Sequence, residues 1–219
     1  MVDTVYLTPS EWQTMTQGVD FTVLTEAQME ALIDRASRLA ESEAGVPLGG
    51  SWLATDYENE QHSWRSTHRI YLYHWPVQTL SEVRIRVGAQ TSAVIQATEI
   101  YMNNTAHYVE ISSLALAFGV APDIVSLGLA EPVVEVDYTA GYDVIPNDIK
   151  EAVAIIASAQ YLNKKLFEEG SAGVVSFTIG SYQVSYGTKQ LGGVAGFGNY
   201  IPDAAKTLLR GYRFAPYLR

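Results

Sequence analysis

The sequence predicts an α+β fold in which a helical core carries a β-rich insertion and a β-hairpin. A long helical pattern after Pro146 is apolar on two sides, which is typical of a helix that is buried by neighbours on both. Residues 48–140 alternate with a period of two, and a Gly-Ser turn later joins two short alternating segments. We therefore expect a single domain over residues 1–219, with the insertion at about 48–140 and a C-terminal extension at 187–219.

The composition and charge of the chain exclude several classes of protein. It has no cysteine, so disulfides, thiolate metal sites and Cys nucleophiles are excluded. It has no apolar run long enough for a membrane helix, and the acidic N-terminus lacks the apolar stretch of a secretory signal, so we expect neither export nor membrane association. The net charge of -10 disfavours binding to a phosphate backbone. Residues 203–219 differ, with four basic side chains and one acidic side chain.

The N-terminal part of the helical core is expected to begin with an arm. Residues 1–23 show no sustained period, so we expect an extended arm with one helical turn near Pro9–Met15, either frayed or laid on a neighbour. The first full helix begins at Thr25, which forms a capping box with Gln28, and ends near Gly45. Its apolar stripe, which we expect to pack on the central helix, consists of Met29, Leu32, Ile33, Ala36, Leu39 and Ala40.

The β-rich insertion is predicted from alternating segments separated by turn residues. Its expected strands are Arg69–Trp75, Ser81–Val87, Ala93–Met102, His107–Ile111 and Val133–Tyr138. Residues 88–92 are predicted as a turn, and residues 114–129 as a loop with a short helical piece. The last strand leads through Gly141 into the central helix, which is expected to run from Pro146 to Glu169.

A β-hairpin and a basic helix are predicted after the central helix. Gly180-Ser181 fits a two-residue turn, because a type II′ turn requires glycine at its first central position. That register pairs Ile179 with Tyr182, Phe177 with Val184 and Val175 with Tyr186 on one apolar face. Because an isolated hairpin is marginal in water, we expect this face to rest on another element.

The C-terminal helix is predicted to follow a glycine-rich connector at residues 187–200. It begins at Pro202, and its apolar stripe consists of Ala205, Leu208, Leu209 and Tyr212. Its charged side carries Lys206, Arg210 and Arg213. This stripe either packs on its own domain or lies in the groove of a partner, in which case the positive charge favours an acidic receptor.

The sequence contains no recognisable catalytic or metal-binding pattern. The four histidines are His62, His68, His74 and His107, and we expect structural or surface roles for them. The acidic segment 56–64 lacks the glycine and terminal glutamate of a calcium loop, so a solvated loop is favoured over a calcium site. There is no phosphate-binding loop, nucleophile elbow or HExxH motif. The sequence therefore predicts no enzyme, no catalytic residue, no metal and no cofactor.

Four segments resemble the head-tail connector proteins of tailed bacteriophages, also called adaptor or head completion proteins. They are VDFTVLTEAQMEALIDRASRLAESEAG, RIYLYHWPVQTLSEVRI, VDYTAGYDVIPNDIKEAVAIIASAQYL and SFTIGSYQVSYG, followed by LLRGYR near the end. They occur in the family's order and cover about half of the chain. The β-rich region around residues 89–129 is larger than in the family's shorter members.

The resemblance implies a structural protein of the virion neck that is assembled in the cytoplasm of a bacterial host. It implies a homo-oligomeric ring, a dodecamer, between the portal protein and a tail or neck completion protein. DNA would pass through the ring as cargo, and an acidic lumen would repel it and let it slide. Rings form from two different surfaces on each subunit, and the N-terminal arm and the hairpin are candidates for them.

The predicted partner-binding residues lie in the C-terminal segment and the hairpin. They are Leu208, Leu209, Arg210, Tyr212, Arg213 and Arg219, together with Phe177, Ile179, Tyr182 and Val184. An alternative function is a virion-associated module that recognises a host-surface glycan through the β-rich region. Its tryptophans, Trp52, Trp64 and Trp75, and the many tyrosines either stack on sugars or fill a core.

Overall fold

A computed structural model describes residues 6–47, 49–63, 69–87, 90–95, 100–104, 108–111, 132–169, 175–186 and 201–214. Contacts among these residues divide the chain into two compact units. The first unit runs through Val46 and resumes at Val144, and the second spans Pro47–Asp143. The mixed helices and antiparallel sheets confirm the predicted α+β class.

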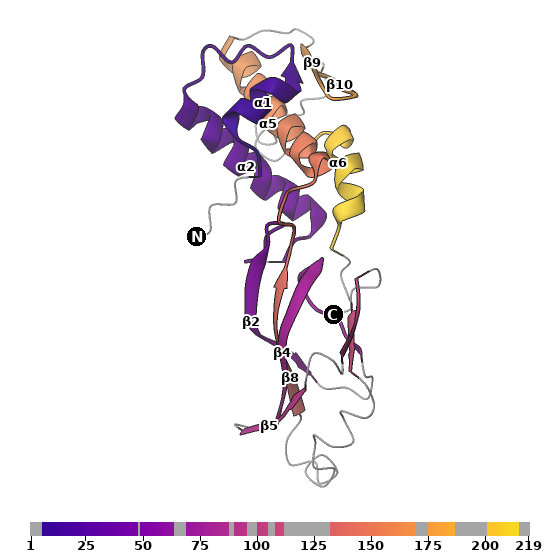
Figure 1. Ribbon diagram of the computed structural model, residues 1–219. Helices are drawn as coiled ribbons and strands as arrows, with labels where there is room; N and C mark the ends of the chain where they lie inside the picture. Colours follow the sequence, from indigo (N-terminus) through magenta and orange to yellow (C-terminus); the bar gives the residue numbers. More distant parts are fainter. Residues whose placement is uncertain are drawn as a thin grey trace. The chain divides into compact units, whose positions relative to one another are not determined.

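The first unit contains the helices (Figure 1). Its elements are α1 (Pro9–Met15), β1 (Thr16–Gln17), α2 (Glu26–Ala44), α5 (Asn147–Glu169), β9 (Val175–Ile179), β10 (Tyr182–Tyr186), α6 (Asp203–Leu209) and the 3-10 helix η3 (Arg210–Tyr212). The central helix α5 is confirmed, because every residue from Ala152 to Leu162 is buried. Both α2 and α6 pack against it. The two apolar stripes of α5 thus bury a continuous core.

Helix α2 has the ends that the sequence predicts. The Thr25 hydroxyl accepts from the backbone N–H of Gln28, and the Gln28 side chain accepts from the backbone N–H of Thr25, which completes the capping box. Gly45 ends the helix in the left-handed conformation with a φ of 72°, where glycine has no Cβ penalty. Met29, Ile33, Ala36 and Ala40 of the predicted stripe are buried, whereas Leu32 and Leu39 are half-buried.

The segment predicted as an N-terminal arm belongs to the core of the first unit from Tyr6 onward. The helical turn predicted near Pro9–Met15 is confirmed as α1. The prediction of an extended arm is wrong for residues 6–17, because Trp12 of α1 is 0% exposed and its indole N–H donates to the Ser158 hydroxyl at 2.9 Å. Directly after α1, β1 pairs with β9. Buried aromatic surface and sheet pairing together fix this segment on its own chain. Residues 1–5 lie outside the described residues.

The hairpin β9–β10 has the predicted register. Ile179 pairs with Tyr182 across the turn, and the remaining pairs continue to Val175 and Tyr186. Gly180 has a φ of 53°, as the turn requires. The hairpin is completed as a three-stranded sheet in the order β1-β9-β10. The expectation that the hairpin rests on another element is thus met by β1 at its edge and by α5, which β9 contacts.

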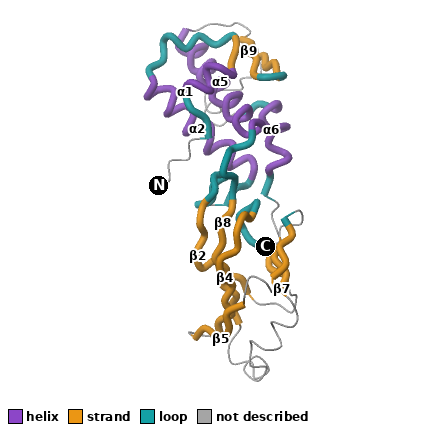
Figure 2. The backbone as a smooth tube through the Cα atoms, viewed as in Figure 1, coloured by secondary structure: helices purple, strands orange, loops and turns teal. Residues whose placement is uncertain are grey.

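The second unit consists of two antiparallel sheets, drawn as orange strands in Figure 2. One sheet has the order β2-β8-β4-β5, and its strands are β2 (Thr55–Ser63), β4 (Val77–Val87), β5 (Gln90–Ile95) and β8 (Pro132–Ala140). The other has the order β3-β7-β6, and its strands are β3 (Arg69–Ile70), β6 (Ile100–Asn103) and β7 (Tyr108–Ile111). Each sheet has one buried apolar face, with Val83 and Val136 in the first and Val109 in the second.

Several predicted strand boundaries in the second unit are wrong. The strand predicted over Arg69–Trp75 ends at Ile70, because the following backbone bonds to side chains instead: the Tyr73 N–H donates to Glu60. The Trp75 indole N–H also donates a hydrogen bond to the Leu72 carbonyl, three residues earlier in the chain. The strand predicted over Ala93–Met102 is two strands in different sheets.

The acidic segment 56–64 was predicted as a loop. This prediction is wrong for residues 56–63. These residues form β2, an edge strand of the four-stranded sheet, because alternate side chains reach its buried face. The turn predicted at residues 88–92 ends earlier, since β5 begins at Gln90. The predicted loop at 114–129 lies outside the described residues, as does the connector at 187–200.

Candidate functional site

The described residues form three groups of polar or exposed side chains that are candidates for a functional site. The first is a cluster around Glu60, whose side chain is 8% exposed. One carboxylate oxygen accepts from the Tyr73 backbone N–H at 2.9 Å and lies 2.7 Å from His62 Nε2. The other accepts the hydroxyl of Tyr138 and lies 4.0 Å from His74 Nε2. The cluster therefore joins β2 and β8 to the segment that follows β3.

A bulge in β2 brings this cluster together. The register against β8 shifts between Tyr57 and Glu60, and Asn59 has a φ of 58°. Strict alternation would place Tyr57 and Glu60 on opposite faces, but the bulge turns both toward the face of Tyr138. Sequence reasoning missed the cluster for this reason. The acidic residues at alternate positions gave no signal of where the bulge lies.

The environment of the cluster shifts the pKa of His74 and of Tyr138. Burial lowers the pKa of His74, although the charge of Glu60 acts in the opposite direction. The ring of His74 stacks on that of Tyr57 at a centroid distance of 3.8 Å. Burial and the neighbouring Glu60 raise the pKa of Tyr138, so its hydroxyl remains a donor. The Glu60 carboxylate is bonded by groups of its own chain, and together with the His74 N–H, which donates to the Tyr138 hydroxyl, these contacts hold Tyr73 and His74 against β2 and β8.

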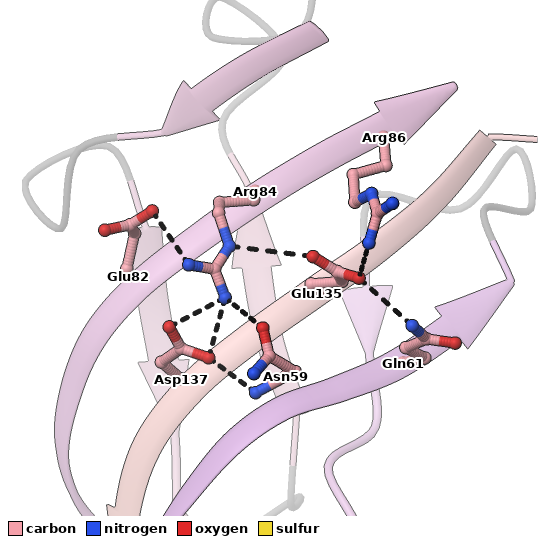
Figure 3. A network of polar contacts seen from close by, with 7 residues as sticks. All are labelled: Asn59, Gln61, Glu82, Arg84, Arg86, Glu135 and Asp137. Carbon is pink, nitrogen blue, oxygen red and sulfur yellow. Dashed lines mark hydrogen bonds and ion pairs between the residues drawn. The ribbon is translucent and has the colours of Figure 1, made fainter. Parts of the chain in front are cut away.

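The second group is a charged network on the other face of the same sheet (Figure 3). Arg84 donates to Asn59 at 2.7 Å and pairs with Asp137 at 2.8 Å, with Glu82 at 3.4 Å and with Glu135 at 3.7 Å. Glu135 also accepts from Arg86 at 2.7 Å and from Gln61 at 3.0 Å. Both arginines are thus held by carboxylates, which neutralises them in place.

No metal centre is formed in the part of the chain that the structure describes. None of its groups of His, Asp and Glu could hold a metal ion. Glu60, His62 and His74 converge, but as hydrogen-bonding and stacking partners. His68 and His107 lie outside the described residues. The described helices include none that is long and apolar enough to span a membrane.

The third group is the predicted partner surface of the C-terminal helix, which is partly used within the first unit. Leu209 is buried, so its side chain contributes to the core of its own chain and is not available to a partner. The Tyr212 hydroxyl donates to Asp148 at 3.2 Å, and Arg213 pairs with Glu43 at 2.6 Å. Arg210 is exposed and Leu208 is half-buried. The apolar stripe of this helix was predicted to pack either on its own domain or in the groove of a partner. Its inner residue Leu209 packs on its own domain.

The predicted partner residues of the hairpin differ in how far they are exposed. Ile179 is fully buried, which removes it from any contact surface in this conformation. Tyr182 is half-buried at the turn. The side chains of Phe177 and Val184 lie outside the described residues, and so does Arg219 at the end of the chain.

The aromatic residues of the second unit fall into two classes. Trp52 and Trp75 are buried, so they fill a core rather than stack on a ligand. Trp64 lies outside the described residues. Tyr73 and Tyr101 are exposed instead, at 56% and 63%. In the β3-β7-β6 sheet, Tyr101 lies on β6 opposite Glu110 of β7.

Comparisons with known proteins find similarity of structure and not of sequence. A chain in the neck of an empty gene transfer agent particle, computed with C6 symmetry, matches 95% of this chain over 90% of its own length, with 15% identity and a TM-score of 0.53. A chain in the virion of a native gene transfer agent particle matches 94% of this chain over 88% of its own, with 16% identity and a TM-score of 0.52. No family model and no curated protein matches the sequence. At these identities the similarity establishes a shared fold.

Proposed function

We propose that this protein is a structural component of the neck of a phage-like particle. The observation that carries the proposal is the similarity to a neck chain over 95% of this chain. The similarity includes the second unit, which is larger than in the shorter connector proteins that the sequence resembles. Two independent lines, four ordered sequence segments and the fold, therefore support the same place in the particle.

The finer proposal is a head-tail connector that forms a ring between the portal protein and the tail machinery. A ring requires two different surfaces on each subunit. The net charge of -10 suits a channel that DNA passes through without binding. The charged network of the second unit agrees with this role, because Arg84 and Arg86 are engaged by carboxylates and are not presented to phosphate. We propose a dodecamer, a structural role without catalysis, and assembly in the bacterial cytoplasm.

Contact with the portal is proposed through the outer side of the C-terminal segment. Leu209 is buried, so the docking surface is reduced to Leu208, Arg210, Tyr212 and Arg213. Arg210 is exposed and carries the positive charge of this surface, whereas Arg213 is paired with Glu43 at 2.6 Å. An acidic groove on the portal would complement this charge.

The proposed function is tested by removing the protein from particle assembly. A strain that encodes the particle without this chain is expected to make DNA-filled or DNA-leaking heads and separate tails. Supplying the chain from a plasmid is expected to restore tailed particles. Electron microscopy of purified particles measures the fraction of heads with tails. Normal tailed particles without the chain would contradict a role in the neck.

A second candidate function is recognition of a host-surface glycan by the second unit. The observation that favours it is the exposure of Tyr73 and Tyr101, since tyrosine rings stack on sugars. Binding of the purified chain to a glycan array, lost in a Tyr73→Ala and Tyr101→Ala double variant, is expected if this function is correct. An array without a signal from the wild-type chain would remove this candidate.

A further inference from the structure

A small pocket in the first unit is lined by uncharged polar side chains and a single carboxylate. It has a volume of about 250 Å³ and lies where α1, β1, the first half of α5 and the β9–β10 turn meet. Its described lining consists of Thr14, Met15, Gln17, Glu151, Thr178 and Gly180. Among these residues Glu151 alone is charged, so its carboxylate sets the electrostatic character of the pocket.

The carboxylate of Glu151 has no hydrogen bond or ion pair with the residues that the structure describes. Its side chain is half-buried. Burial and, after it, the charge of Asp148 raise the pKa of Glu151. Lys150, the next residue along the helix, pairs with Glu11 at 2.6 Å instead. A partly buried charge without a partner costs free energy, and a cation from outside the chain would remove this cost.

The turn of the hairpin leaves room for this carboxylate. Gly180 has a φ of 53°, and a Cβ built there would lie 3.0 Å from one carboxylate oxygen of Glu151. The walls are held together, because β1 pairs with β9 beside the turn and the ion pair between Lys150 and Glu11 joins α5 to α1. A pocket that is already formed binds at a lower entropic cost than one that must first be ordered.

The other lining residues indicate which ligand the pocket fits. The Thr14 hydroxyl donates to the Ser10 carbonyl at 2.8 Å, so its oxygen is left as an acceptor. Gln17 and Thr178 add further side-chain oxygens, and Met15 adds an apolar wall. A positively charged group that only donates hydrogen bonds complements these acceptors, which describes arginine and lysine. The apolar stem of either side chain fits along the methionine.

We propose that this pocket binds an arginine or lysine side chain of a partner protein, with the cation on the Glu151 carboxylate and the stem against Met15. The net charge of -10 also favours a partner with a basic surface. The inference rests on the proposed function for the identity of this partner, a protein that adjoins the first unit in the neck. None of the lining residues belongs to the segment proposed to contact the portal, so the pocket adds a second contact.

Single amino-acid analogues test the pocket without any partner protein. N-acetyl-arginine methylamide and the lysine analogue are titrated into the isotope-labelled full chain and followed by NMR. We expect saturable shifts of the Thr14, Gln17 and Gly180 amides, with a dissociation constant on the order of 1 mM. The citrulline analogue, which has nearly the shape of arginine without its charge, is expected to leave these amides unshifted. The absence of shifts with both basic analogues, or equal shifts with citrulline, overturns the inference.

Glu151→Gln removes the charge and keeps the shape of the side chain. It is expected to weaken binding of the basic analogues about tenfold, because a charge-assisted hydrogen bond is lost. Its Tm is expected to equal or exceed that of the wild type, since the carboxylate has no partner to lose. Glu30→Gln, at an exposed position of α2, is the control with the same change of charge and is expected to bind normally. Wild-type binding by Glu151→Gln, or a lowered Tm, overturns the inference.

Particle assembly separates this inference from the proposed function. In the plasmid complementation, Glu151→Lys is expected to lower the fraction of heads with tails about fivefold and Glu151→Gln to lower it less, whereas Glu30→Lys restores tailed particles. Full restoration by Glu151→Lys overturns the partner contact and leaves the neck function standing. Normal tailed particles without the chain contradict the neck function, and the titration then still decides whether the pocket binds a basic side chain.

Discussion

At the scale of single residues, Gly141 shows why one backbone position is restricted. Its φ is 116°, and a Cβ built there would lie 2.4 Å from the Leu53 carbonyl oxygen. The Gly141 N–H also donates to the Pro76 carbonyl at 2.8 Å, so the backbone cannot move away without losing this bond. The Tyr-x-x-Gly-Tyr segment that resembles the connector family thus has a physical reason for its glycine.

Gly141→Ala is expected to lower the free energy of unfolding by more than about 2 kcal/mol, through a left-handed backbone and a clash with Leu53. For a chain of this length, that corresponds to a fall in Tm of roughly 4–8 °C. Gly211→Ala is the matched control, because no atom lies within 4 Å of its built Cβ. Thermal unfolding followed by circular dichroism measures both. Equal Tm values for the two variants would contradict this account of Gly141.

His74 makes the stability of the second unit sensitive to acid. Burial lowers its pKa below the ordinary value of 6.5, so the unfolded chain takes up a proton that the folded chain resists. Stability from the neutral ring is therefore present above about pH 6.5 and decreases as the pH falls below it. The groups that face His74 are Glu60, Tyr57 and Tyr138.

We expect the free energy of unfolding to fall less steeply between pH 7 and pH 5 in a His74→Gln variant than in the wild-type chain. Urea unfolding at a series of pH values gives both slopes. The comparison isolates His74 because the other titrating groups are present in both proteins. A variant with the wild-type slope would show that His74 does not carry the acid sensitivity.

Some features of single residues were predictable from the sequence and others were not. The capping pair Thr25 and Gln28 and the glycines at the turns were predictable, because each acts through its own backbone. The cluster at Glu60 was not, because it depends on a bulge whose position only the pairing with β8 fixes. The sequence alone could not predict whether Leu209 is buried in its own domain or exposed to a partner. An apolar helical stripe is compatible with both.

At the scale of elements, α6 is part of the core of the first unit. Ala205 and Leu209 are buried, and α6 packs on α5 and α2. The Phe214 N–H also donates to the Ala44 carbonyl at 2.8 Å, which ties the end of the described chain to α2. Removing residues 200–219 is therefore expected to uncover this core and to destabilise the fold.

Leu209→Ala is expected to cost about 2–5 kcal/mol of unfolding free energy, because it leaves a cavity between packed helices. Leu208→Ala is expected to cost less than about 1 kcal/mol, since this neighbouring leucine is only half-buried. Urea titration of the full chain measures the difference. The reverse order of the two costs would contradict the orientation of α6.

Portal binding is a separate property of the same element. Arg210→Glu is expected to weaken binding to purified portal protein at least fivefold and to leave the Tm unchanged, because Arg210 is exposed. Arg38→Glu on α2 is the control with the same change of charge, and it is expected to bind as the wild type does. Biolayer interferometry at two salt concentrations measures both. Identical affinities for the two variants would exclude Arg210 from the portal contact.

The elements were predictable where local pattern and tertiary packing agree. The hairpin register follows from its Gly-Ser turn, and α5 follows from its length and its two apolar stripes. The second unit was harder, because β3 ends where the Tyr73 N–H bonds to a carboxylate instead of to a strand. The N-terminal segment was harder for a similar reason, since Ser158 and β9, which hold α1 and β1, are distant in the sequence.

At the scale of the whole molecule, the chain resembles phage connector proteins in four sequence segments and shares its fold with two chains of gene transfer agent particles. Four sequence segments resemble connector proteins, and they coincide with α2, with the start of β4, with the β8–α5 junction and with the hairpin. The fold is shared with chains of gene transfer agent particles over 94% and 95% of this chain. The segments alone could not predict this extent, because residues 89–129 depart from the shorter connectors in length.

The most direct test of the neck proposal is the symmetry of the assembled protein. The purified full chain is mixed with portal protein, separated by size, and imaged by cryo-electron microscopy. We predict closed rings stacked on the portal, with twelve copies of this chain in views along the axis. A chain that remains monomeric, and that leaves the portal unoccupied at micromolar concentration, would contradict the central claim.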